Sequence, residues 1–214
     1  CIGVTKQLCS QENLENVLMI NSLLPHKIDH ICKIRGIRFI HLSTDCVFTG
    51  EKGNYKESDT PDATDLYGRS KALGEVDSTT SLTIRKSTIG LELNNKHGLL
   101  EWFLAQEKSI EGYSGAIYSG LSTSHLASII EEIIIEYPGL NKILNIASEP
   151  ISKFTLLCEL RDRLEDCDIE IIEDDKISVD RSLAPLKLLK ETDINIPSWD
   201  QMLDDLAKEI NERK

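Results

Sequence analysis

The chain has 214 residues, of which 40% are hydrophobic and 28% are charged, and its formal net charge is -12. This composition is ordinary for a globular protein, and the negative charge excludes a broad basic surface of the kind that binds nucleic acid. The longest apolar run, residues 129–135, contains Glu131 and Glu132 and is too short to cross a bilayer. We therefore expect neither nucleic acid nor a membrane as partner, while a local basic pocket for a small anionic ligand stays open.

The first half of the chain alternates between strand and helix patterns. Residues 1–4 read as the end of a strand, and residues 14–34 have helical apolar spacing, interrupted by Pro25 and ended by Gly36. Residues 38–42 form a buried-strand pattern. A polar loop follows over residues 49–65, and loops of that length are often functional. A helix containing Tyr67 and Lys71 and a strand over 81–85 come next, so the order predicts parallel βαβ units with helices on both faces.

The second half is mixed. Helices are predicted over residues 99–104, 124–137, 152–164 and 198–211, with Ser152 as a cap of the third. Strands are predicted over 143–146 and 169–172. This region does not read as a simple continuation of the first sheet.

Tyr67 and Lys71 form the most informative pair. They are four residues apart, so a helix places them on one face. Ser43, Thr44 and Asp45 follow the strand over 38–42, and ligands in parallel α/β folds sit at the carboxyl ends of strands. A hydroxyl at a strand end, together with a Tyr/Lys pair on the next helix, can hydrogen-bond and protonate a carbonyl oxygen. By itself, a tyrosine–lysine pair at this spacing is weak evidence for a catalytic site, since short motifs arise by chance.

Several further motifs raise the specificity of this signal. In chain order they are STDCVFTG at 43–50, YKE at 55–57, LYGRSK at 66–71, LTIR at 82–85 and IPSW at 196–199. With these motifs the chain resembles the extended short-chain dehydrogenase/reductase family, and within it the dTDP-4-dehydrorhamnose reductase-like members. The resemblance runs in order over most of the chain.

The resemblance implies an α/β fold. We expect a partial Rossmann-type doubly wound parallel sheet, without its leading β/α units, and a smaller mixed α/β region. Residues 1–91 would form the carboxyl-terminal part of the NAD(P)-binding domain. Residues 92–214 would form mainly the substrate-binding region, with elements at about 121–148 returning to the sheet.

The resemblance also implies a reaction, in which a nucleotide-linked deoxysugar loses its 4-keto group by reduction with NADPH or NADH. Tyr67 would donate the proton, Thr44 would align the carbonyl oxygen, and Lys71 would hold the nicotinamide ribose and lower the pKa of Tyr67, which is otherwise about 10. Ser43 is expected near the cofactor. Such a reaction would supply cell-surface polysaccharide.

Three other residues carry two interpretations each. Asp45 aligns with a position that touches the substrate sugar, but an aspartate starting a loop also satisfies local backbone amides. Asn21 matches an asparagine that supports the active site, or is a polar residue on a helix flank. Arg85 approaches a phosphate or, as we favour, forms a structural ion pair. None of the five histidines is predicted to be a metal ligand, and no metal is expected.

Two features depart from the family pattern. The Gly-rich dinucleotide turn is absent, so the chain reads as a reductase truncated at its amino end, which would bind NAD(P)H poorly. Thr88 stands where rhamnose-forming reductases carry an aromatic residue against the substrate. Thr88 is therefore expected to contact the substrate, which is a nucleotide-linked deoxysugar but need not be the precursor of rhamnose.

The six cysteines form no CxxC pair and no cluster with histidine, so reduced structural thiols and a cytoplasmic location are expected. Cys46 lies beside the expected site, and a reactive thiol there is the minority interpretation.

Two alternative functions stay open. One is an epimerase or dehydratase with tightly held NAD, although Cys46 stands where a dehydratase would carry a glutamate after Asp45. The other is a non-catalytic scaffold or regulator, and the resemblance leaves room for a homodimer.

Overall fold

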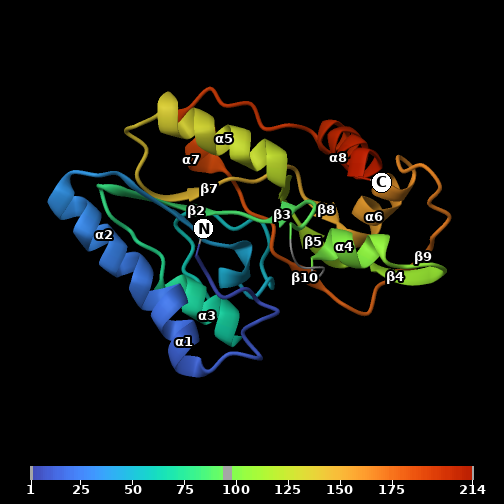
Figure 1. Ribbon diagram of the computed structural model, residues 1–214, viewed down its shortest axis with the longest axis horizontal. Coiled ribbons are helices and arrows are strands. Elements are labelled where there is room, and N and C mark those ends of the chain that lie inside the picture. The colour runs from blue at the N-terminus through green and yellow to red at the C-terminus, as the bar shows by residue number, and fades with distance from the viewer. Residues whose placement is uncertain (1, 94–97, 214) are drawn as a thin grey trace.

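A computed structural model describes residues 2–93 and 98–213 of the chain. Its main sheet has three parallel strands in the order β1 (Phe39–Leu42), β2 (Ser81–Arg85) and β7 (Lys142–Asn145). Figure 1 labels β2 and β7 of this sheet. β2 lies in the middle, and all five of its residues are buried, as expected for a strand covered on both faces. Helices separate the strands in the chain, because parallel neighbours need long crossovers. The predicted α/β class is confirmed.

One helical segment precedes β1. It consists of α1 (Leu14–Leu18), a π-helical turn (Met19–Leu23) and α2 (Leu24–Arg35). Pro25 lies in the first turn of α2, where its missing N–H costs little, so the irregularity in this helix is the π-helical turn before it. Gly36 ends α2 in the left-handed conformation with φ 65°, as predicted from its position.

Helices cover both faces of the main sheet. α2 and α3 (Leu66–Leu73) lie on one side, and α5 (Thr123–Ile135) lies on the other (Figure 1). Ser122 caps α5 by accepting a hydrogen bond from the backbone N–H of His125. The apolar side chains that α5 buries are Leu126, Ile129 and Ile133.

The described residues of the second region form three small sheets and three helices. One sheet pairs β5 (Ala116–Tyr118) with β10 (Val179–Asp180) and β8 (Ile151–Ser152). The other two pair β4 (Ser109–Tyr113) with β9 (Glu170–Asp174), and β3 (Thr88–Ile89) with β6 (Leu121–Ser122). The helices are α4 (Leu99–Leu104), α6 (Lys153–Arg161) and α8 (Trp199–Arg213), whereas α7 (Leu186–Glu191) lies against β7 of the main sheet. Ser152 caps α6 by accepting from the N–H of Thr155, which confirms the predicted cap.

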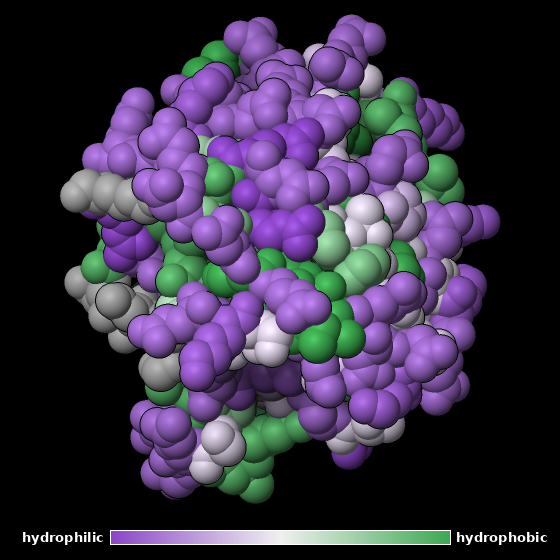
Figure 2. All heavy atoms as spheres, turned by 90° about the vertical axis from the view of Figure 1, so that its right-hand side faces the viewer, coloured by the Kyte–Doolittle hydropathy of each residue, from purple (hydrophilic) through white to green (hydrophobic). Residues whose placement is uncertain are grey.

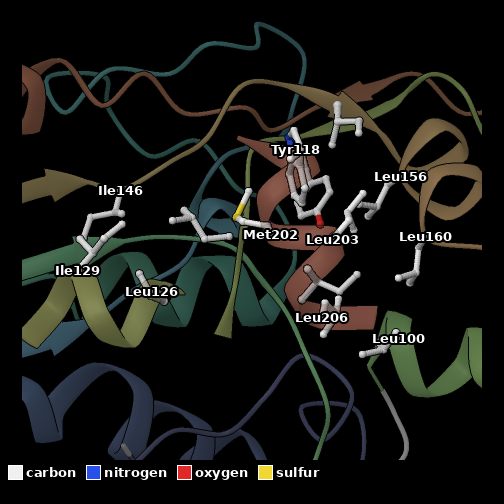
Figure 3. Close-up of a cluster of buried hydrophobic side chains, with 14 of the residues drawn as sticks. Leu100, Tyr118, Leu126, Ile129, Ile146, Leu156, Leu160, Met202, Leu203 and Leu206 are labelled. Atoms are coloured by element: carbon white, nitrogen blue, oxygen red, sulfur yellow. The ribbon is translucent and has the colours of Figure 1, made fainter. Parts of the chain in front are cut away.

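A single large core joins the sheet to this second region. Figure 3 shows side chains from α4, α5, α6 and α8 converging with Tyr118 of β5 and Ile146, which follows β7. Met202 and Leu203 of α8 are completely buried within it. Outside the core, the face around β4, β9 and α8 is covered mainly by hydrophilic side chains (Figure 2), in keeping with the high content of charged residues.

The long polar loop after β1 is firmly attached to the second region. The backbone N–H of Tyr55 donates to the carbonyl of Ser182 at 2.8 Å, and the N–H of Ala184 donates to the carbonyl of Tyr55 at 2.8 Å. The Tyr55 ring stacks on Phe48 with centroids 4.0 Å apart. The loop therefore connects the end of β1 to residues far along the chain.

Several sequence-based predictions of secondary structure were wrong or incomplete. Residues 2–4 form no strand: the backbone N–H and carbonyl of Val4 bind the side chain of Asn21 instead. Cys1 of that predicted strand lies outside the described residues. The strands β3, β4, β5, β6, β8 and β10 and the helix α7 were not predicted. Within the described ranges no helix is long and apolar enough to span a membrane. The domain boundary near residue 91 stays a prediction.

Candidate active site

The end of β1 carries Ser43, Thr44 and Asp45, and all three are buried. Backbone bonds continue the pairing past the strand, since the N–H of Ser43 donates to Ile84 O at 2.7 Å and that of Asp45 donates to Lys86 O at 3.2 Å. The Thr44 hydroxyl accepts from the N–H of Cys46 at 3.1 Å and donates to Asp45 Oδ1 at 3.0 Å. Thr44 thereby caps the short 3-10 turn over Asp45–Val47 and is fixed in place.

Helix α3 brings Tyr67 and Lys71 to this strand end. Asp65 caps the helix by accepting from the N–H of Gly68 at 2.9 Å. Gly68 allows a very close approach, because a Cβ atom there would lie 2.2 Å from the carbonyl oxygen of Cys46. The glycine between Tyr67 and Lys71 is therefore what lets α3 lie directly against the turn that contains Thr44.

Lys71 is buried in this arrangement. Its Nζ donates to the carbonyl oxygen of Leu42 at 2.8 Å. Burial, and next the charge of Lys86, lower the pKa of Lys71 to about 8, while the charge of Glu75 acts in the opposite direction. An ammonium group has three donors, so the bond to Leu42 leaves two for a ligand.

Tyr67 contacts Thr44 from the first turn of α3. Burial, followed by the charge of Cys46, raises the pKa of its phenol above the ordinary value, while a hydrogen bond with Thr44 works in the opposite direction. We expected Lys71 to bring this pKa down, and the net effect in the structure is the reverse, because burial dominates. At neutral pH the Tyr67 Oη consequently keeps its proton, which a proton donor requires.

Asn21 supports the site from the π-helical turn. Its side chain is 1% exposed, so the flank interpretation is wrong. Its Nδ2 donates to the carbonyl of Val4 at 3.0 Å and to the hydroxyl of Ser70 at 3.2 Å, and its Oδ1 accepts from the N–H of Val4 at 2.8 Å. Asn21 thus connects α3 to the segment before α1. π-Helical turns occur often at functional sites, but the sequence pattern did not predict this one.

Arg85 forms the structural ion pair that we favoured. Its Nε and one terminal nitrogen donate to the two carboxylate oxygens of Glu75 at 2.8 and 2.7 Å. Both side chains are almost fully buried, at 3% and 6% exposure. Glu75 Oε1 also accepts from the hydroxyl of Ser43 at 2.8 Å, so Ser43 binds the ion pair.

Basic residues that were not predicted from the sequence lie near Asp45 and Cys46. Lys86 follows β2, Lys153 begins α6, and Arg181 follows β10. Burial lowers the pKa values of Lys86 and Lys153, and the charge of Asp45 opposes this effect in both. Arg181 donates through Nε to Phe48 O at 2.9 Å and lies near Cys46. These positions come from distant parts of the chain, so no local motif could group them.

Thr88 lies in β3 and is exposed. Lys86 Nζ donates to its hydroxyl at 3.4 Å, which places Thr88 beside the group of basic side chains. A role of Thr88 in substrate binding stays a prediction.

Cys46 is a poor nucleophile. Burial, reinforced by the charge of Asp45, raises the pKa of its thiol to about 11, so little thiolate is present at neutral pH. This environment argues against the minority interpretation of a reactive thiol. The five cysteines that the structure describes are free thiols, and within the same residues no group of three His, Cys, Asp or Glu side chains could hold a metal ion.

His41 on β1 is buried next to the site. Its Nε2 has no hydrogen-bond partner among the described residues, and burial, followed by the charge of Lys71, lowers its pKa to about 4. The imidazole is thus neutral at physiological pH. It was not predicted to have a role.

Comparison with known proteins gives consistent results. The family model of the RmlD substrate-binding domain matches residues 5–89. A dTDP-4-dehydrorhamnose reductase from Aggregatibacter actinomycetemcomitans is 36% identical over 121 residues, which are 52% of this chain and 41% of that protein. The chain spans well under half the length of the curated relatives that it matches, 25% and 41%.

Solved structures extend the similarity to nearly the whole chain. A crystal structure of a hypothetical dTDP-4-dehydrorhamnose reductase from Sulfolobus tokodaii matches with a TM-score of 0.76 and 28% identity, covering 92% of this chain and 75% of that one. A dTDP-4-dehydrorhamnose reductase from Bacillus anthracis, in complex with NADP, matches with a TM-score of 0.82, covering 98% and 79% of the two chains. Its 18% identity makes this second match evidence for the fold alone.

Proposed function

We propose that the chain is a member of the extended short-chain dehydrogenase/reductase family and that its site reduces the 4-keto group of a nucleotide-linked deoxysugar with NADPH or NADH. The observation that carries the proposal is the meeting of three side chains. Thr44 at the end of β1 contacts the Tyr67 phenol, and Lys71 lies buried beside the same strand end. The dTDP-4-dehydrorhamnose reductases to which the chain is similar supply the substrate class.

The residues present fit the nicotinamide end of the cofactor. Lys71 has free donors beyond its bond to the Leu42 carbonyl, and these suit the hydroxyl groups of a ribose. Ser43 lies one residue from Thr44 and completes the proposed cofactor-binding set with Tyr67 and Lys71. The bound cofactor supplies a hydride to the carbonyl carbon. The B. anthracis structure of the same fold contains NADP.

Tyr67 is the proposed proton donor. Burial keeps its Oη protonated before the reaction. The Thr44 hydroxyl donates to Asp45 Oδ1 in the free chain, and on substrate binding it would turn its one hydrogen to the carbonyl oxygen and align that oxygen beside the phenol. As the proton leaves Oη, the Lys71 ammonium stabilises the phenolate that remains. General acid catalysis of this kind contributes roughly 10²–10⁴-fold to a rate.

The basic side chains near Asp45 suit an anionic substrate. Lys86, Lys153 and Arg181 place positive charge beside the catalytic turn of a chain whose formal net charge is -12. We assign them to the diphosphate of the nucleotide, and Asp45 and Thr88 to the sugar. Polysaccharide biosynthesis as the pathway follows from the substrate class.

A titration with Tyr67→Phe tests the proposal. NADPH and NADH binding is followed by fluorescence, and ketone reduction by loss of NADPH absorbance, for the unmodified chain and for the variant. We expect Tyr67→Phe to leave cofactor binding unchanged and to lower the reduction rate by about 10²-fold or more. Equal rates for the variant and the unmodified protein would remove Tyr67 from the mechanism. A failure of both forms to bind either cofactor would favour the scaffold alternative.

A homodimer and a cytoplasmic location complete the proposal. Ile31 and Ile34 on α2 and Leu73 at the end of α3 are exposed, and apolar surface of this kind often marks an interface. The five described cysteines are free thiols, which suits a reducing compartment. Light scattering on the purified chain gives its oligomeric state directly.

A further inference from the structure

Two residues of α3 and one that follows this helix engage three consecutive residues at the end of β1. Tyr67 contacts Thr44, Lys71 donates to the carbonyl of Leu42, and Glu75, which follows the helix, accepts from the hydroxyl of Ser43. Tyr67, Lys71 and Glu75 are each four residues apart. The first two are the proposed catalytic pair, whereas Glu75 has no role in the proposed reaction.

Glu75 is held more rigidly than an ordinary surface carboxylate. Arg85 binds both of its oxygens, at 2.8 and 2.7 Å, in a buried two-pronged pair. The guanidinium carbon of Arg85 in turn lies 5.0 Å from the centre of the Phe48 ring. The third interaction of Glu75, with Ser43, consequently fixes the residue next to Thr44.

We propose that Glu75 is a positioning residue of the active site: its carboxylate fixes the Ser43–Thr44 strand end and places a negative charge four residues from Lys71. Its role in ketone reduction depends on the proposed function, whereas its action on Lys71 can be measured without any substrate. The motif that marks this role is a tyrosine, a lysine and a glutamate at a spacing of four, followed by an arginine at the end of the next strand.

Lys71 needs such a partner because its surroundings oppose its charge. Burial and the Lys86 ammonium, which follows β2, both favour the neutral amine, and Glu75 on its own chain segment opposes them. His41 on β1 also faces Lys71, but it is neutral at physiological pH. The pKa of Lys71, about 8, leaves the amine mostly protonated at neutral pH. Without the Glu75 charge this pKa falls further.

The test is the pKa of Lys71 in the apo chain, measured from the pH dependence of its acetylation rate by mass spectrometry. We expect Glu75→Gln to lower this pKa by about one pH unit. Glu132→Gln on α5, which lies on the other side of the sheet (Figure 1), is the matched control and leaves it unchanged. Ser43→Ala removes the hydrogen bond but keeps the charge, so it also leaves the pKa unchanged. An unaltered Lys71 pKa in folded Glu75→Gln overturns the proposal.

Glu75→Gln leaves Arg85 as a buried cation without its anion, which can prevent folding. In that case the comparison is made in an Arg85→Gln background, with and without Glu75→Gln. The variant that lacks Glu75 must then show the lower Lys71 pKa, and equal values overturn the proposal. Reductase activity of the unmodified chain is measured separately. Its absence would refute the proposed function, while the acetylation experiment still decides how Glu75 acts on Lys71.

Discussion

Gly68→Ala probes the contact that holds α3 against the catalytic turn. In an ordinary helix this change stabilises, because alanine has a helix propensity about 1 kcal/mol better than glycine. Here the new methyl group would lie 2.2 Å from the carbonyl oxygen of Cys46 and 2.5 Å from the Cβ of Ala63. The first neighbour is backbone and cannot move aside as a flexible side chain can, so the helix has to shift. Overpacking of this kind typically costs about 1–3 kcal/mol.

Thermal and urea unfolding followed by circular dichroism measure this effect. For a chain of this size each kcal/mol corresponds to roughly 2–4 °C in Tm, so we expect Gly68→Ala to lower Tm by several degrees. Gly139→Ala is the control, since a Cβ there meets nothing within 4 Å, and it should change Tm little. Because the helix shift displaces Tyr67 and Lys71, Gly68→Ala should also impair ketone reduction. A Tm equal to or above that of the unmodified chain would refute the close contact.

Two further predictions concern buried titratable groups. The pKa of His41 is about 4 in the folded chain and 6.5 when unperturbed, so the unfolded state binds more protons in this range and stability is lost as the pH falls from 6.5 to 4. His41→Leu should reduce the loss of unfolding free energy between pH 6.5 and 4 by about 3 kcal/mol. Urea unfolding at a series of pH values measures this loss. The same loss in the variant and in the unmodified chain would contradict the burial of a neutral His41. Cys46, with a pKa of about 11, should react with iodoacetamide at pH 8 much more slowly than Cys32, and faster alkylation of Cys46 would contradict its assigned environment.

Local patterns predicted several elements for different reasons. The strands over 39–42 and 81–85 are short runs of apolar and β-favouring residues, and the helix over 66–73 was predicted from the Tyr67/Lys71 motif. The helices over 123–135 and 199–213 were also predicted. The strands β3, β6, β8 and β10 contain two residues each, which is too short for any period to appear. The strand predicted over residues 1–4 failed for a different reason. The side chain of Asn21 hydrogen-bonds the N–H and the carbonyl of Val4, which a strand neighbour would otherwise do.

The site was predictable to the extent that its members lie in short motifs. Thr44, Tyr67 and Lys71 each belong to a contiguous stretch, and the structure brings the three together. Lys153 and Arg181 reach the same place through the pairing of β5 with β8 and β10, which no sequence spacing encodes. The raised pKa of the Tyr67 phenol could not be foreseen either, since it depends on burial.

The most direct test of the central claim is the mass of the product formed from a nucleotide-linked 4-keto-6-deoxysugar in the presence of NADPH. A reductase adds a hydride to the carbonyl carbon and a proton from Tyr67 to its oxygen, so we predict that the product gains the mass of two hydrogen atoms. With NADPH deuterated at the transferred position, one of the two should be deuterium. A product of unchanged mass would indicate epimerisation, and loss of one water would indicate a dehydratase. Either of these results, or recovery of the untouched ketone with the cofactor bound, would contradict the assignment of Thr44, Tyr67 and Lys71 as a reductase site.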